Sequence, residues 1–222
     1  MPFNYFIFSL RTISNLFMIV GAGIFVFTYG PIMYSEISYR LADHGQTVIV
    51  GSVSGDVVAQ PLPSEDDSLG IDKIKAVDDN FSVVIPSIEV NAPVVADVTM
   101  VNEAEYMNAL EEGVAHAVGT PYPGENGNMF LFAHSSLNFW QLGPYATVFN
   151  LLNKLKDGDL VYVVKDSKTY IYKVKKTEVV KGWDTTPFDR EYEEPMLTMV
   201  TCYPPGTTLS RYVVTSTYIG ME

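Results

Sequence analysis

From about residue 80 to the C-terminus, the sequence is a series of short β-type runs separated by turn signals, and no other feature restricts the fold as much. The stretch FSVVIPSIEVNAPVV (81–95) predicts two short strands, with breaks at Pro86 and Pro93. NMFLFAH (128–134) is a continuous apolar run, as expected for a strand buried on both faces. Many short strands with few helices favour a small closed or nearly closed β-barrel.

A hairpin is expected in the middle of this region. LVYVV (160–164) follows the turn Asp157-Gly158-Asp159, and the run that begins at Thr169 alternates in polarity. Asp166-Ser167-Lys168 lies between the two runs and has the composition of a turn. The two runs are therefore predicted to be neighbouring antiparallel strands.

Two segments have helical patterns. Asn102, with Glu105 three residues later, predicts a capping box at the start of a helix, and Gly113 predicts its end. Three apolar residues at a spacing of three predict a second short helix over one end of the barrel: Phe149, Leu152 and Leu155.

The N-terminal region has the features of a membrane anchor. No residue from Thr12 to Ser35 is charged, and about 20 apolar residues suffice to cross a bilayer as a helix. We therefore predict a transmembrane helix at 13–35, in preference to a cleaved signal peptide or a buried core helix, because no small-residue cleavage site ends the run. Arg11 favours a cytoplasmic tail at 1–12, which places the rest of this single-pass protein on the extracytoplasmic face of the cell membrane.

The composition of residues 36–222 indicates two parts, a tether and a folded domain. Residues 36–79 are rich in Gly, Ser, Pro and acidic residues, as in QPLPSEDDSLG (60–70), and read as an extracytoplasmic tether. Residues 80–222 have the size of one domain. The net charge of −12 opposes a phosphate backbone, so nucleic acid is excluded as a partner.

The chain contains a single cysteine, Cys202. Outside the cytoplasm a lone cysteine forms an intermolecular disulfide, acts as a reactive thiol, or fills space as a small hydrophobe. Arg211 follows nine residues later, on the same face of a β-type run as Val213. It is therefore either paired in a surface salt bridge or directed at a ligand. If the two strands are antiparallel neighbours, the thiol and the guanidinium meet at one rim.

A reactive thiol needs a proton partner, usually a histidine. His44 lies in the expected tether and is interpreted as solvent-exposed. His116 follows the first predicted helix and is interpreted as structural. His134 ends a buried apolar run, where a strand delivers its side chain to a rim, so it is the favoured candidate.

These residues resemble a known family. TMVTC (198–202) with an arginine nine residues later resembles the signature of sortases, which are membrane-anchored cysteine transpeptidases of bacterial surfaces. Three further stretches agree in order: VVIPSIEVNAPVV (83–95), GVAHAVGTPYPGENGNMFLFAHSS (113–136) and LNKLKDGDLVYV (152–163). The resemblance covers about residues 80–219. It departs at Met199, where the family usually has Leu, and at Ala133, where it often has Gly; neither change removes a catalytic atom.

The resemblance implies a mainly β protein, with a closed barrel of about eight strands and short helices at 80–222 after one transmembrane helix. It also implies that Cys202 is the nucleophile, His134 the acid/base and Arg211 the group that binds substrate and oxyanion. Thr201 is added as a further oxyanion donor through its amide and hydroxyl. The thiolate would cleave an LPXTG-like sorting signal near the C-terminus of a surface protein and form an acyl-thioester. An amine of peptidoglycan or of a pilin would then accept the acyl group.

Neither a cofactor nor a metal is predicted. Some sortases bind calcium, and DREYEEP (189–195) with Glu103, Glu105, Glu111 and Glu112 supplies oxygen ligands. A solvated acidic surface is the simpler interpretation of these residues.

Two other functions stay open from the residues alone. The first is a non-catalytic, membrane-tethered β-barrel that binds partners, in which Cys202 fills the core and Arg211 is a surface ion. The second is a cysteine peptidase directed at peptidoglycan, which would cleave wall peptides and ignore an LPXTG-like peptide.

Overall fold

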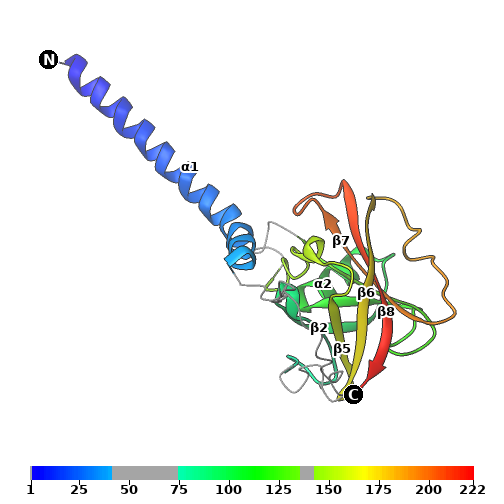
Figure 1. The fold of residues 1–222 in the computed structure, drawn as a ribbon. Coiled ribbons are helices and arrows are strands. Elements are labelled where there is room, and N and C mark those ends of the chain that lie inside the picture. Colours follow the sequence, from blue (N-terminus) through cyan, green and yellow to red (C-terminus); the bar gives the residue numbers. More distant parts are fainter. Residues whose placement is uncertain (1, 42–74, 136–142) are drawn as a thin grey trace, which may run out of the picture.

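The computed structural model describes residues 2–41, 75–135 and 143–222. They form a long N-terminal helix followed by a closed eight-stranded barrel (Figure 1), which confirms the predicted mainly β fold. The strands are β1 (Phe81–Ile85), β2 (Val90–Val98), β3 (Val114–Ala117), β4 (Gly127–Ala133), β5 (Leu160–Lys165), β6 (Lys168–Lys181), β7 (Pro195–Tyr203) and β8 (Ser210–Met221). The helices are α1 (Pro2–Leu41), α2 (Glu103–Glu112) and the 3₁₀ turns η2 (Pro86–Ile88) and η3 (Leu152–Lys154).

The strand order around the barrel is β1-β2-β3-β4-β7-β8-β6-β5, and β5 pairs with β1 to close it. Most neighbours are antiparallel, but β2 with β3 and β4 with β7 are parallel. Strand β7 therefore lies between β4, which is distant in the sequence, and β8, which follows it directly. The three residues predicted to be catalytic, His134, Cys202 and Arg211, lie at the ends of these three strands.

Side chains on these three strands alternate between two faces. Met199 of β7 and Val214 of β8 belong to the main core inside the barrel. Val200 and Val213 instead join Phe130 in a smaller cluster, against which Phe188 packs. Because adjacent positions on one strand point to opposite faces, this smaller cluster lies on the outer face of the barrel.

Several sequence predictions are confirmed. Strand β5 pairs with β6 through a loop of two residues, Asp166 and Ser167, which both have positive φ (51° and 63°), as the tightest hairpin turns require. Strand β1 ends before Pro86, and helix α2 ends before Gly113.

Two details differ from the prediction, and a third agrees with it. Strand β2 continues through Pro93, which is tolerated there because β3 pairs with β2 only from Val94 onward. The Asn102 side chain makes no capping bond to the backbone of α2, and its amide instead reaches the Glu105 carboxylate at 3.5 Å. The short helix predicted around Leu152 is present as the 3₁₀ turn η3, which is only three residues long, and its three apolar residues are buried in the core as expected.

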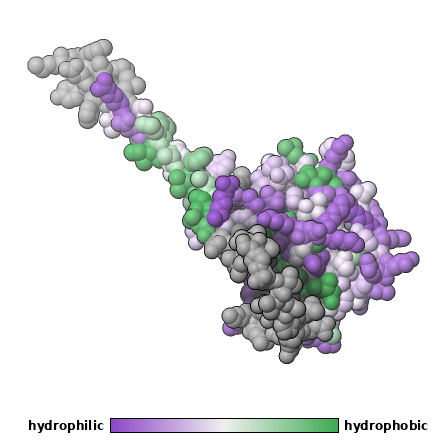
Figure 2. All heavy atoms as spheres, viewed as in Figure 1, coloured by the Kyte–Doolittle hydropathy of each residue, from purple (hydrophilic) through white to green (hydrophobic). Residues whose placement is uncertain are grey.

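The segment predicted to cross a membrane, 13–35, lies within α1, whose exposed apolar side chains appear as a green band in Figure 2. Across the described residues, however, no helix combines the length and the apolar character that a membrane span requires. Residues 36–41 continue α1, and the Glu36 carboxylate pairs with the ammonium group of Lys154 in η3 at 2.8 Å. The remainder of the predicted tether, from 42 to 74 with His44, lies outside the described residues.

His116 has the structural position that the sequence suggested. Its ring is fully buried, with Nε2 at 3.1 Å from the Pro121 carbonyl oxygen and 3.0 Å from the Thr120 hydroxyl. That hydroxyl donates to the Ala117 carbonyl, so the proton between the ring and Thr120 must belong to Nε2. The neutral ring satisfies these contacts, and burial lowers the pKa of His116, with the nearby Asp97 carboxylate opposing the effect.

This buried ring predicts a dependence of stability on pH. A histidine in the unfolded chain takes up a proton near pH 6.5, whereas folded His116 resists it, so the free energy of unfolding decreases as pH falls below about 6.5. We expect a lower Tm at pH 5.5 than at pH 7.5, and a smaller difference in a His116→Gln variant, measured by circular dichroism. An equal pH dependence in the variant and the unaltered protein would contradict this assignment.

Candidate active site

A cavity of about 610 Å³ opens on the outer face of β4, β7 and β8. Its walls come from α2, from the β7–β8 loop and from residues 182–194 between β6 and β7, which we call the covering segment. His134, Cys202 and Arg211 all line this cavity. No three side chains of His, Cys, Asp or Glu converge as metal ligands within the part of the chain that the structure describes.

Strand register brings the three predicted residues together. Ala133 of β4 is the parallel partner of Thr201 in β7, so the next residues along each strand, His134 and Cys202, stand side by side. Cys202 is also the direct antiparallel partner of Arg211 in β8, and such partners have Cβ atoms about 4.5–5.5 Å apart. Residues separated by up to 77 positions thus meet at one end of three adjacent strands.

Cys202 is a free, partly exposed thiol. It shares the outer face of β7 with Val200, whereas Met199 points into the main core. The thiol therefore opens onto the cavity instead of filling the barrel interior, which argues against the inert interpretation of this cysteine.

His134 lies just beyond the end of β4 and is half-buried. Its Nε2 atom is buried and has no hydrogen-bond partner among the described residues. Burial lowers the pKa of His134, and the Glu111 carboxylate at the end of α2 opposes this effect. The imidazole is therefore mostly neutral at pH 7, and no described residue occupies its Nε2 atom.

Arg211 is held by two backbone carbonyls. Its Nη1 donates to the carbonyl oxygens of Thr208 at 3.3 Å and Ser210 at 3.2 Å. Within residues 75–135 and 143–222 no carboxylate lies within 4.0 Å of the guanidinium, so the surface salt bridge considered from the sequence is not formed there. The positive charge of the Arg211 guanidinium can therefore interact with a group bound in the cavity.

Thr201 is buried, and its hydroxyl donates to the Ala133 carbonyl oxygen at 2.8 Å. This bond uses the one proton of the hydroxyl and joins β7 to β4 near the site. The hydroxyl is thus occupied, and only the backbone amide of Thr201 stays a predicted oxyanion donor.

Ser135 is a residue that the sequence reasoning missed. Its buried hydroxyl donates to the Cys202 carbonyl oxygen at 2.5 Å, and its own carbonyl oxygen accepts a bond from the Gly206 amide at 2.6 Å. Ser135 therefore fixes the backbone of the thiol relative to the strand end that carries His134. Its position directly after the histidine was visible in the sequence, but its contact with Cys202 depends on the parallel pairing of β4 and β7.

Gly182, at the start of the covering segment, packs directly on the loop that holds Arg211. Its amide donates to the Leu209 carbonyl oxygen at 3.0 Å. A Cβ atom added at Gly182 would lie 2.3 Å from the Thr208 carbonyl oxygen, which is one of the two acceptors of Arg211. Any larger residue must displace that oxygen, and the guanidinium with it.

We therefore expect a Gly182→Ala variant to lose about 1–3 kcal/mol of unfolding free energy, as overpacked sites do. A cation beside a thiol accelerates alkylation by anionic iodoacetate more than by neutral iodoacetamide. The ratio of these two rates at Cys202 should fall in the variant towards the ratio of Arg211→Gln. A ratio equal to that of the unaltered protein would show that Gly182 does not position the guanidinium.

Comparisons with known proteins agree with this geometry. A family model described as the sortase domain matches residues 83–219, well over half of the chain. Sortase D of Bacillus subtilis (strain 168) is 29% identical over 133 residues, which are 59% of this chain and 59% of that protein. The match thus spans about three-fifths of the length of this curated relative.

Solved structures of sortases share the barrel. Sortase C-1 from Actinomyces oris (formerly Actinomyces naeslundii) is 32% identical with a TM-score of 0.54, over 65% of this chain and 76% of that one. Sortase C from Clostridium perfringens, solved with the C-terminal cell wall sorting motif, is 26% identical with a TM-score of 0.52, over 63% and 69% of the two chains. Because the family model, the barrel and these relatives agree, the chain belongs to the sortase family of transpeptidases.

Proposed function

We propose that the protein is a cysteine transpeptidase that cleaves an LPXTG-like sorting signal near the C-terminus of a surface protein and transfers that protein to an amine of peptidoglycan or of a pilin. The observation that carries this proposal is the shared cavity, where a free thiol, an imidazole and a guanidinium that has no acidic partner among the described residues meet. The similarity to a sortase C solved with a cell wall sorting motif supports the substrate class.

In the first half-reaction, the Cys202 thiolate attacks the carbonyl carbon of the Thr-Gly peptide bond in the signal, and a carbon–sulfur bond forms. The carbonyl oxygen becomes an oxyanion, which the permanent charge of Arg211 stabilises. The carbon–nitrogen bond then breaks, and protonated His134 gives its proton to the departing glycine amine. The products are an acyl-thioester on Cys202 and a free C-terminal peptide.

In the second half-reaction, an amine of the acceptor attacks the thioester carbonyl carbon. Neutral His134 takes the proton that the amine loses, and the carbon–sulfur bond breaks to release the thiolate. One amide bond replaces another, so the exchange needs no oxidant, reductant or cofactor. The thioester divides one difficult substitution into two easier steps.

The protonation state of His134 limits the first half-reaction. The leaving amine needs the charged imidazole, whereas burial lowers the pKa of His134 and favours the neutral ring. The competent form, a thiolate together with an imidazolium, is therefore a minority of the molecules, and a slow enzyme is the expected consequence.

The placement of the thiol supports this proposal over a non-catalytic binding module. In such a module Cys202 would be sealed in the core, and Arg211 would be a surface ion. Cys202 instead lines the cavity, and Arg211 lies beside it without a carboxylate within reach in the described regions.

We also propose that α1 anchors the protein in the cell membrane by residues 13–35, with residues 1–12 in the cytoplasm and the barrel outside. The uncharged run from Thr12 to Ser35 and the exposed apolar side chains of α1 support this location. Extraction of bacterial membranes with alkaline carbonate tests it. The full chain should stay with the membrane, and a chain beginning at residue 42 should not.

The acyl-thioester gives a direct test of the activity. We expect the full chain in detergent, incubated with a panel of LPXTG-like peptides, to gain the mass of the acyl fragment on Cys202, and added amines to discharge it. Mass spectrometry measures both events, and Cys202→Ala is the control that should form no adduct. Cleavage of wall peptides with no adduct from any LPXTG-like peptide would favour the peptidoglycan peptidase instead.

The pH profile gives an independent test of His134. Its pKa is lowered by burial and raised by Glu111, so removal of the Glu111 charge should lower this pKa further. We expect the acid limb of kcat/KM to shift to lower pH in Glu111→Gln. Glu112→Gln is the matched control, because it makes the same charge change at the neighbouring exposed residue. Coincident profiles of the Glu111 and Glu112 variants would count against His134 as the titrating group.

A further inference from the structure

The covering segment supplies one wall of the cavity. Trp183, Pro187 and Phe188 line it from this segment, and Tyr106 lines it from α2. The Phe188 ring packs edge-on against Phe130 of β4, with ring centroids 5.3 Å apart. This wall stays in place only if the segment is held on the outer face of the barrel.

Asn128 holds the segment at its centre. This side chain is 6% exposed, at the start of β4. Its Nδ2 donates to the Pro187 carbonyl oxygen at 3.0 Å and to the Phe188 carbonyl oxygen at 3.3 Å, while its Oδ1 accepts from the buried Thr198 hydroxyl at 2.6 Å. Because two backbone carbonyls can only accept, the amide nitrogen must face them, and the orientation of Asn128 is fixed.

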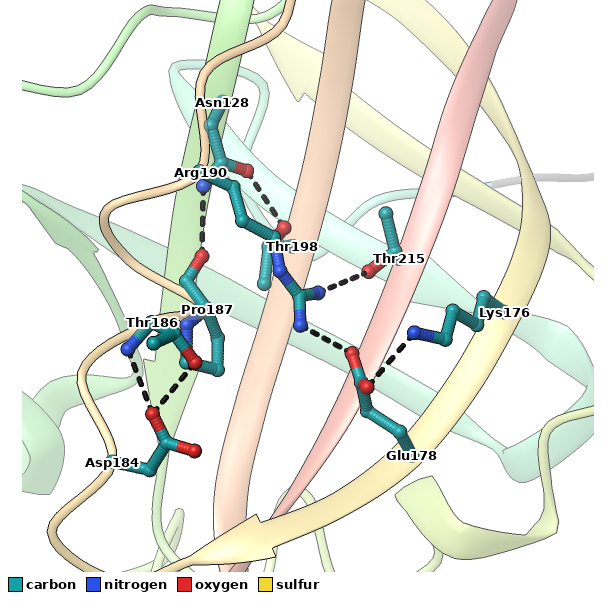
Figure 3. A network of polar contacts seen from close by, with 9 residues as sticks. All are labelled: Asn128, Lys176, Glu178, Asp184, Thr186, Pro187, Arg190, Thr198 and Thr215. Atoms are coloured by element: carbon teal, nitrogen blue, oxygen red, sulfur yellow. Dashed lines mark hydrogen bonds and ion pairs between the residues drawn. The ribbon is translucent and has the colours of Figure 1, made fainter.

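Arg190 holds the segment at a second point. Figure 3 shows it reaching from the covering segment across β7 and β8 to Glu178 on β6. Its guanidinium donates to the Glu178 carboxylate at 2.5 Å and to the Thr215 hydroxyl at 3.4 Å, and Lys176 contacts the same carboxylate at 2.9 Å. The side chains of Arg190 and Glu178 are 24% and 23% exposed, so water screens this pair less than a surface pair.

Neither residue belongs to the chemistry itself. Asn128 and Arg190 do not line the cavity. Asn128 lies at the start of β4, six residues before His134, which corresponds to about 20 Å of extended chain. Any effect of these residues on a substrate therefore acts through the segment that they hold.

We propose that Asn128 and Arg190 are positioning residues that hold the covering segment on the barrel, so that Trp183, Pro187 and Phe188 form a fixed apolar wall for the side chains of the sorting signal. This inference rests on the proposed transpeptidase function. Loss of either contact frees the wall formed by the middle of the segment, whereas Gly182 at its start keeps its bond to Leu209. The thiol, imidazole and guanidinium therefore stay in place. Binding of the peptide then weakens more than its chemistry.

Asn128→Asp is the sharpest variant. It has nearly the same shape and keeps an oxygen for Thr198, but it replaces the donor to Pro187 and Phe188 with an acceptor. Asn126→Asp is the matched control, because it makes the same change at an exposed position two residues away.

Arg190→Gln provides a second, less buried test in case the Asn128 variant does not fold, and Arg190→Lys restores the charge opposite Glu178.

Hydrogen exchange and peptide kinetics on the full chain test the proposal together. In Asn128→Asp and Arg190→Gln we expect backbone amides of residues 183–194 to exchange about tenfold faster, and KM for the peptide to rise about tenfold with kcat within about threefold. Asn126→Asp should match the unaltered protein in both measurements, and Arg190→Lys should recover part of the KM. Alkylation of Cys202 by iodoacetamide should stay unchanged in all four variants.

Unchanged exchange in both disruptive variants, or a loss confined to kcat, would overturn the inference. Hydrogen exchange needs no substrate. If the unaltered protein turned over no LPXTG-like peptide, the proposed function would fail, and the exchange rates alone would still show whether these residues hold the segment.

Discussion

The pairing register of β4, β7 and β8 is the constraint on which the site depends. The parallel pair Ala133–Thr201 and the antiparallel pair Cys202–Arg211 put three reactive side chains at one end of adjacent strands. Since side chains alternate between faces along a strand, a slip of one residue in β7 would turn Cys202 into the core. The hydrophobic core on the inner face is therefore also what keeps the thiol outside.

The same alternation lets one strand serve two purposes. Leu197, Met199 and Thr201 face the barrel interior, and Thr198, Val200 and Cys202 face outward. Along the outer face the character changes from polar to apolar to reactive. The polar end receives Asn128, the apolar middle packs with the cluster that includes Phe188, and the reactive end opens to the cavity. The covering segment is held at the polar end of this face, and it thereby sets the shape of the cavity at the end that carries Cys202.

Much of this arrangement could be predicted from local sequence. The two-residue turn at Asp166, the buried run of β4 and the spacing from Cys202 to Arg211 are signals within about 15 residues. Asn128 and Ser135 left no such signal, because their partners Pro187 and Cys202 are more than 50 residues away in the sequence. Periodicity predicts that a strand exists but does not identify its parallel neighbour. The contacts of Asn128 and Ser135 depend on the parallel pairing of β4 with β7, so they could not be predicted in this way.

Two arginines near the outer face of β8, Arg190 and Arg211, differ in the groups that they contact. Arg190 is paired with Glu178, and this ion pair helps to hold the covering segment on the barrel. Arg211 has only two backbone carbonyls, and no carboxylate lies within 4.0 Å of it in the described regions. A half-buried cation without a counter-ion is costly in the resting protein. In the proposed reaction, an oxyanion forming beside Cys202 would remove that cost, so the stabilisation by Arg211 would be greatest in the transition state, where it would increase the rate.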